Sequence, residues 1–96
     1  MNGQYAGWLR WNLFWDNTPF MNMLFVLENC RQKGIGRALV ENWEKECLSA
    51  GYSLVLTSTQ SDEGAQHFYR HVGYKECGSL ILPGEVLEII FCKQLN

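Results

Sequence analysis

Two glycines and three basic residues lie close together in one short segment, Arg31-Gln32-Lys33-Gly34-Ile35-Gly36-Arg37. A predicted helix begins within it, and the first N–H groups of a helix are unpaired and carry partial positive charge. The glycines let an anion approach this backbone, and the basic side chains add positive potential. The segment therefore predicts a cradle for a phosphate or pyrophosphate group.

Two common phosphate-binding loops do not match these glycines. The chain lacks the spacing of the Walker A loop, G-x-x-x-x-G-K-[ST]. The dinucleotide-binding loop, G-x-G-x-x-G, fails because Leu39 occupies its third glycine position. A tight strand-to-helix turn with incidental charge is the alternative interpretation of Gly34 and Gly36.

A second segment of interest runs from Asp62 to Tyr74. On its predicted helix, Ala65 and Tyr69 share one apolar face, where a small side chain permits close approach of a ligand or strand. Tyr69 either carries its phenol into a cleft between strands or is a core tyrosine bonded to the backbone. His67 and His71 lie one turn apart, but no third ligand is evident and we expect no metal.

Strands and helices must hold these two segments in place. Strand and helix patterns follow one another along the chain in the order β-β-α-β-α-β-β. This order predicts one mixed α/β domain over residues 1–96. Four-residue apolar spacing predicts helices at Gly34–Ala50 and Glu63–Val72. Apolar and aromatic runs bounded by turn residues predict strands at Gly7–Trp15, Phe20–Leu27, Leu54–Thr57, Tyr74–Leu82 and Val86–Cys92.

The same patterns predict several details of burial. Phe20–Leu27 is almost wholly apolar, as in a central strand that is covered on both faces. We expect Asp62 to cap the second helix. The aromatic residues Trp8, Trp11 and Trp15 indicate core packing or a subunit interface. On the first helix, the side chains expected to face water are Arg37, Glu41, Glu44 and Lys45.

Composition excludes several classes of protein. Of the 96 residues, 47% are hydrophobic and 14% aromatic, too apolar for a disordered chain. A net charge of -2 without a basic stripe argues against a nucleic-acid partner, and no apolar run reaches the ~20 residues of a membrane span. With no signal peptide and no dense cysteine framework, we expect a cytoplasmic protein with free thiols at Cys30, Cys47, Cys77 and Cys92.

Both chemical segments resemble motifs of the GNAT superfamily of N-acetyltransferases. Arg31-x-x-Gly34-Ile35-Gly36-x-x-Leu39 is similar to motif A, R/Q-x-x-G-x-G/A. Ala65-x-x-Phe68-Tyr69-x-x-x-Gly73-Tyr74 is similar to motif B. The spacing of the motifs and the βαβ unit between them also match, so the resemblance covers roughly residues 7 to 95.

The resemblance implies that acetyl-CoA, or another acyl-CoA, is the co-substrate and that a small-molecule or peptide amine is the acceptor. The amine would attack the thioester directly in a ternary complex. Tyr69 matches the catalytic tyrosine that protonates the departing thiolate. Amides near Val26 and Leu27 would polarise the thioester carbonyl. Pantetheine would bond to the backbone of Leu24, Phe25 and Val26, and pyrophosphate to Arg31, Gln32, Lys33, Gly34, Ile35, Gly36 and Arg37.

The chain departs from the family in three ways. Asp62 stands where motif B has asparagine, and Phe20 stands where many relatives carry a glutamate that acts as the general base. Glu28 and Glu88 are the other carboxylates considered for this role, and neither is assigned. The usual N-terminal β-α-α-β elements, which wall the acceptor site, are lacking. We therefore expect a fragment or a homo-oligomer in which another copy completes the fold.

Two functions stay open on this basis. One is transfer of an acyl group from acyl-CoA to a primary amine, which the motif A segment and Tyr69 favour. The other is a non-catalytic acyl-CoA-binding or partner-binding module derived from a GNAT domain, which the lacking N-terminal elements favour.

Overall fold

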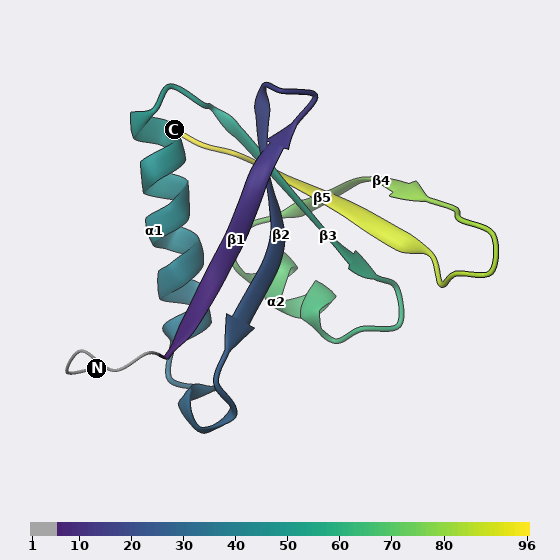
Figure 1. Cartoon of the computed structure of the whole chain (residues 1–96), viewed down its shortest axis with the longest axis horizontal. Helices are drawn as coiled ribbons and strands as arrows, with labels where there is room; N and C mark the ends of the chain where they lie inside the picture. The colour runs from purple at the N-terminus through teal and green to yellow at the C-terminus, as the bar shows by residue number, and fades with distance from the viewer. Residues whose placement is uncertain (1–5) are drawn as a thin grey trace.

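The computed structural model describes residues 6–96, which form a five-stranded sheet with two helices (Figure 1). The strands lie in the order β1-β2-β3-β5-β4; β2 and β3 are parallel, and the other neighbours are antiparallel. The predicted mixed α/β fold is therefore confirmed. The elements are β1 (Gly7–Phe14), β2 (Thr18–Val26), a short 3-10 helix η1 (Glu28–Cys30), α1 (Ile35–Ser49), β3 (Leu54–Gln60), α2 (Ala65–His71), β4 (Lys75–Leu80) and β5 (Glu88–Gln94).

The predicted boundaries differ from these most clearly around α2. The strand β3 continues to Gln60, because its antiparallel ladder with β5 runs without interruption from Leu54. The prediction that Asp62 caps α2 is wrong, since Gly64 is the N-cap and no side chain caps this helix. The Glu63 carboxylate instead accepts a hydrogen bond from the Gln60 N–H at 3.0 Å.

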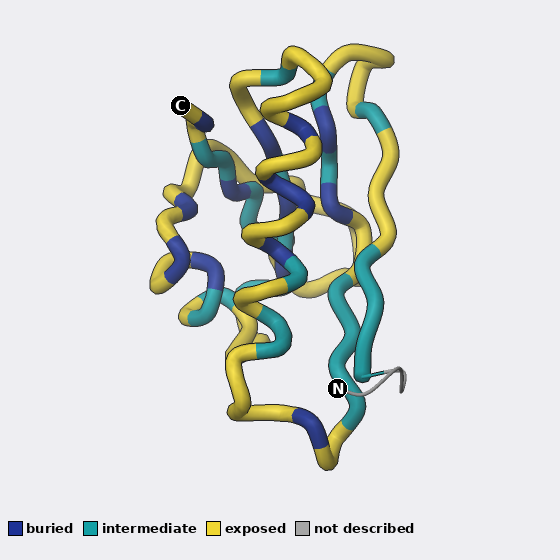
Figure 2. The backbone as a smooth tube through the Cα atoms, turned by 90° about the vertical axis from the view of Figure 1, so that its left-hand side faces the viewer, coloured by how far each residue is buried: buried dark blue, intermediate teal, exposed yellow. Residues whose placement is uncertain are grey.

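One face of the sheet carries both helices, and the core lies between them and the strands (Figure 2). Within residues 6–96, no helix covers the opposite face, here called the open face. The prediction that Phe20–Leu27 is covered on both faces is therefore wrong, and Met23 is 45% exposed. The buried core residues are Met21, Val40, Trp43, Cys47, Val55, Tyr69, Val72, Tyr74, Phe91 and Leu95.

The three tryptophans in and after β1 lie in different surroundings. Trp8 stacks on Phe25, with ring centroids 5.7 Å apart. Trp11 packs against Trp43 of α1 at 6.1 Å and so helps to hold that helix on the sheet. Trp15 lies in the β1–β2 turn, where it is 80% exposed and has a positive φ of 54°. The three side chains therefore do not share one packing or interface role.

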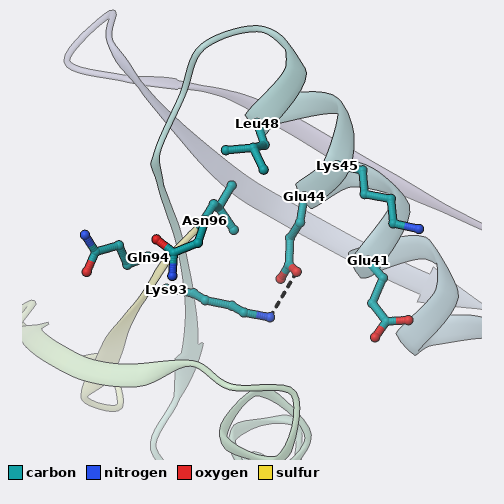
Figure 3. A pocket seen from close by; sticks show the side chains of 8 residues that line it. Glu41, Glu44, Lys45, Leu48, Lys93, Gln94 and Asn96 are labelled. Atoms are coloured by element: carbon teal, nitrogen blue, oxygen red, sulfur yellow. Dashed lines mark hydrogen bonds and ion pairs between the residues drawn. The ribbon is translucent and has the colours of Figure 1, made fainter.

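A buried carboxylate on α1 forms the centre of a polar cluster between the helix and β5 (Figure 3). Glu44, predicted to face water, is only 9% exposed. Its carboxylate accepts hydrogen bonds from the Tyr74 hydroxyl at 2.8 Å and from Lys93 Nζ at 3.0 Å. Lys93 also donates to the Val72 carbonyl at 2.9 Å. Burial and the Glu44 carboxylate raise the pKa of Tyr74 well above its usual range.

The Glu44 cluster leads to a stability prediction. Removing one partner of a buried ion pair costs about 3–5 kcal/mol, because the other charge stays buried without compensation. The Lys93 side chain remains 27% exposed, so we expect Lys93→Met to lower the free energy of unfolding by about 2 kcal/mol.

The measurement is urea unfolding of both proteins. Arg37→Ala is the matched control, because it removes an exposed ion pair with Glu41 and should change the free energy by less than about 0.5 kcal/mol. Equal losses in the two variants would contradict a special contribution from the Glu44 cluster.

Candidate functional site: a cleft between diverging strands

Two neighbouring strands separate at the centre of the sheet. The parallel pairing of β2 and β3 consists of Phe20↔Leu56 and Met21↔Thr57 only. The next residue, Asn22, is an extra residue in the ladder with β1, which is the pattern of a β-bulge. Because a bulge bends its strand, the rest of β2 turns away from β3 immediately after their last pair.

The divergence exposes backbone groups of β2. The Leu27 N–H donates to the Ala6 carbonyl at 2.8 Å, which makes this a hydrogen-bonded pair. In an antiparallel ladder, hydrogen-bonded pairs alternate with pairs whose backbone N–H and carbonyl groups point away from the partner strand. Val26 and Leu24 belong to pairs of the second kind, so their backbone polar groups point away from β1. In agreement, the Val26 carbonyl accepts a hydrogen bond from Arg31 Nε at 3.0 Å. The Leu24 N–H and carbonyl and the Val26 N–H remain directed into the opening.

The start of α1 closes one end of this opening. Gly34 is the N-cap and has a φ of 80°, a left-handed conformation that favours glycine. The first intrahelical bond runs from the Ala38 N–H to the Gly34 carbonyl at 3.0 Å. The N–H groups of Ile35, Gly36 and Arg37 precede it and have no partner within the helix. They are suited to contact an anion.

The basic side chains of this segment take different positions. Arg31 is folded against the end of β2 by its bond to Val26. Arg37 lies 3.3 Å from a carboxylate oxygen of Glu41, so part of its charge is already balanced. Lys33 is exposed and does not line the cleft described next.

A cleft of about 850 Å³ connects the diverging strand, the start of α1 and the face of α2. It brings together nine of the ten residues predicted to contact the co-substrate, all except Lys33, and it also includes Tyr69. The small residues Gly64 and Ala65 form part of the α2 wall; Gly64 was not predicted, although the small pair is visible in the sequence. The lining residues are Leu24, Phe25, Val26, Arg31, Gln32, Gly34, Ile35, Gly36, Arg37, Gly64, Ala65, Phe68 and Tyr69.

Tyr69 belongs both to this cleft and to the core. It is 6% exposed, and its ring contacts those of Phe68, Tyr74 and Phe91. Burial raises the pKa of its phenol above the usual range, and the neighbouring Thr57 hydroxyl partly offsets this effect. Tyr69 therefore holds its proton at neutral pH, as a proton donor must.

The other residues with possible chemistry lie apart from the cleft. Among residues 6–96, no three His, Cys, Asp or Glu side chains gather in a way that could hold a metal ion. Both His67 and His71 are exposed on α2. In the same described part of the chain, no helix is long and apolar enough to cross a membrane.

Comparison with known proteins assigns the chain to a family. The sequence pattern of the Acetyltransferase (GNAT) family matches residues 1–74. The chain belongs to the GNAT acetyltransferase family. No curated protein matches the chain in sequence.

Solved structures of GNAT proteins share the fold at low sequence identity. The ribosomal-protein-S18-alanine N-acetyltransferase from Escherichia coli is 20% identical, with a TM-score of 0.81 over 99% of this chain and 64% of that protein. A GNAT acetyltransferase from Elizabethkingia anophelis with acetyl-CoA bound is 15% identical, with a TM-score of 0.83 over 99% of this chain and 72% of that one. For nourseothricin acetyltransferase the identity is 19% and the TM-score 0.85, over 99% of this chain and 61% of that protein. This GNAT chain thus spans about three fifths of the length of several relatives.

The start of α1 gives a binding prediction for coenzyme A. Gly34→Glu should abolish binding, because the new carboxylate would stand where a phosphate is expected. Gly34→Ala is the matched control: a Cβ there meets no atom within 4 Å, so this variant carries the same left-handed strain without the charge.

Calorimetry and the melting temperature with coenzyme A both report the outcome, since a ligand of the native state raises the melting temperature. We expect the alanine variant to be less stable but still to bind. Unchanged binding by Gly34→Glu would contradict a phosphate site at this helix start.

Proposed function

We propose that the chain transfers an acyl group from acyl-CoA to a primary amine. The observation that carries this proposal is the cleft itself, in which unpaired strand groups, unpaired helix-start N–H groups and a protonated phenol face one space. Several structural relatives were solved with acetyl-CoA or coenzyme A bound, which supports the same co-substrate here.

In the proposed arrangement, pantetheine lies along β2 and bonds to the free groups of Leu24 and Val26. Phe25, whose backbone groups face β1, would contribute a wall of the cleft. The pyrophosphate would contact the helix-start N–H groups of Ile35, Gly36 and Arg37, with Arg31 beside it. Leu27 is excluded as a donor to the thioester carbonyl, because its N–H already bonds to Ala6; the Val26 N–H remains available for that role.

Tyr69 is proposed as the general acid. A thiol has a pKa near ~8.5, so its thiolate leaves more readily when a phenol donates a proton to the sulfur. Direct attack by the amine, without an acyl-cysteine intermediate, is favoured because no cysteine lines the cleft in residues 6–96. Burial and the neighbouring Glu46 and Glu44 carboxylates also raise the pKa of Cys47 to about 11, so its nucleophilic thiolate is scarce.

A non-catalytic module remains the second candidate function. The observation in its favour is the open face of the sheet, where apolar residues such as Phe14 and Leu54 are each 41% exposed. Such a module would bind acyl-CoA in the same cleft but would not transfer the acyl group.

The variant Tyr69→Phe separates the two functions. It should leave coenzyme A affinity almost unchanged, because only a hydroxyl is lost. With an acceptor found by a thiol-release screen of amines, kcat and kcat/KM should fall together by ~10²–10⁴, since the proton is donated in the transition state. Tyr52→Phe is the matched control, as Tyr52 packs beside the core and away from the cleft.

Two outcomes of this experiment would change the proposal. Full turnover by Tyr69→Phe would limit Tyr69 to packing. Tight coenzyme A binding by the natural chain without turnover on any amine would favour the non-catalytic module.

We further propose that the chain self-associates through the β4–β5 hairpin, which extends away from the helices (Figure 1). Its connection carries an exposed apolar run: Leu80 is 50%, Ile81 85% and Leu82 52% exposed. Exposed apolar patches of this kind favour association.

Light scattering tests this proposal. The natural chain should be a dimer or larger, and the double variant Ile81→Asp, Leu82→Asp should shift it toward monomer. Trp15→Ser, which removes an exposed ring in the β1–β2 turn, should leave the mass unchanged. A natural chain that stays monomeric at high concentration would remove the proposal.

A further inference from the structure

The open face of the sheet has its own cleft, of about 770 Å³, over the same separating strands. Aromatic side chains from the β1–β2 hairpin line it, together with a polar residue from each diverging strand. Among the lining residues are Phe14, Trp15, Phe20, Asn22, Leu56 and Ser58.

A carboxylate on β5 lies beside this cleft. The Ser58 hydroxyl donates a hydrogen bond of 2.6 Å to the Glu88 carboxylate. Both side chains are half-buried. Within residues 6–96, no Lys, Arg or His nitrogen lies within 4.0 Å of Glu88; the three ion pairs there use Glu41, Glu44 and Glu76. A half-buried carboxylate without a counter-ion on an apolar surface is suited to a ligand that brings a cation.

The positions of Thr57 and Ser58 place this carboxylate opposite Tyr69. Successive side chains of a strand point to opposite faces of the sheet. Thr57 points to the helix-covered face, where it is buried next to the Tyr69 phenol. Ser58 points to the open face, where it bonds to Glu88. The pair Met21↔Thr57 is the last before the strands diverge, so the opening has a phenol on one face and a carboxylate on the other.

We propose that the open-face cleft binds the acceptor, that this acceptor is a primary ammonium attached to an aromatic or apolar group, and that Ser58 and Glu88 remove its proton. The aromatic residues Phe14, Trp15 and Phe20 would hold the apolar group. This inference rests on the proposed acyl transfer and adds to it the class of the acceptor and the proton acceptor.

One ammonium proton passes to Ser58 Oγ while the Ser58 hydroxyl proton passes to Glu88, which leaves a neutral amine. The amine nitrogen forms a bond to the thioester carbonyl carbon while the carbonyl π electrons move to oxygen, and these electrons re-form the carbonyl as the thiolate leaves. The carbon–sulfur bond then breaks, and Tyr69 protonates the departing sulfur. Water then carries the second proton from the acylated nitrogen to the Tyr69 phenolate, which restores the phenol. Glu88 releases its proton to solvent.

Binding of the acceptor is tested first, with the full chain saturated with coenzyme A at pH 7. The probes are 2-phenylethylamine and its uncharged analogue 2-phenylethanol. We expect the amine to bind about 10-fold or more tightly than the alcohol, the scale of one charge-assisted hydrogen bond, and this preference to vanish in Glu88→Gln. Failure to bind coenzyme A counts against the proposed function. Coenzyme A binding without a preference for the amine overturns only the present inference.

Catalysis is tested with two acceptors that differ in charge. Phenylacetic hydrazide is neutral at pH 7 and needs no proton removed before attack, whereas 2-phenylethylamine is an ammonium. Glu88→Gln should lower kcat/KM for the amine by ~10² but leave that for the hydrazide within a few-fold. Ser58→Ala should show the same selectivity. Equal losses with both acceptors would assign Glu88 and Ser58 to structure and overturn the inference.

Glu85→Gln serves as the control, because Glu85 is an exposed carboxylate in the β4–β5 connection. It should leave both rates unchanged. Melting temperatures of all variants, with and without coenzyme A, show whether each is folded.

Discussion

The bulge at Asn22 is the constraint on which the candidate site depends. Without an extra residue there, β2 could continue its parallel ladder with β3 beyond Met21↔Thr57. The polar groups of Leu24 and Val26 would then bond within the sheet. Because the strands separate instead, these groups need partners from outside the sheet, and a molecule that offers amides at strand spacing can supply them. One irregular residue thus creates both a space and a set of unmet hydrogen bonds.

The separated strands are held in place by the helix α1. On one side of the opening, Trp43 of α1 packs against Trp11 of β1. On the other side, Glu44 of α1 is bonded to Lys93 of β5. Consecutive residues of one helix therefore fix the two halves of the sheet, and the same helix presents its unpaired N–H groups to the cleft. This arrangement couples the packing of the core to the geometry of the site.

Local patterns in the sequence predicted much of the molecule correctly. The order of strands and helices follows from short-range periodicity, and the start of α1 follows from Gly34, whose left-handed φ of 80° explains why glycine stands there. Nine of the ten residues predicted to contact the co-substrate line one cleft, because they lie in two continuous segments. Prediction succeeds where the determining residues are neighbours in the chain.

Features that depend on distant residues were missed for the same reason. Helical spacing placed Glu44 on a polar face, and only the fold reveals a lysine and a tyrosine opposite it. The bulge at Asn22 has no signal in its own segment, since it is defined by the register with β1. The bond between Ser58 and Glu88 joins residues 30 positions apart. Asp62 shows the opposite error: its side chain is a favourable N-cap by local sequence, but it does not cap α2 because that helix begins only at Ala65.

The short ladder between β2 and β3 also determines where the sheet is weakest. The seam between β1 and β2 contains eight paired positions, that between β3 and β5 seven, and that between β4 and β5 five. The seam between β2 and β3 contains two. Local opening tends to follow the boundary with the fewest bonds to break, so we expect the β1–β2 hairpin and the three remaining strands to open as two cooperative units. The sheet should then loosen first along the line where an extended guest molecule would insert, and filling that line would join the two units into one.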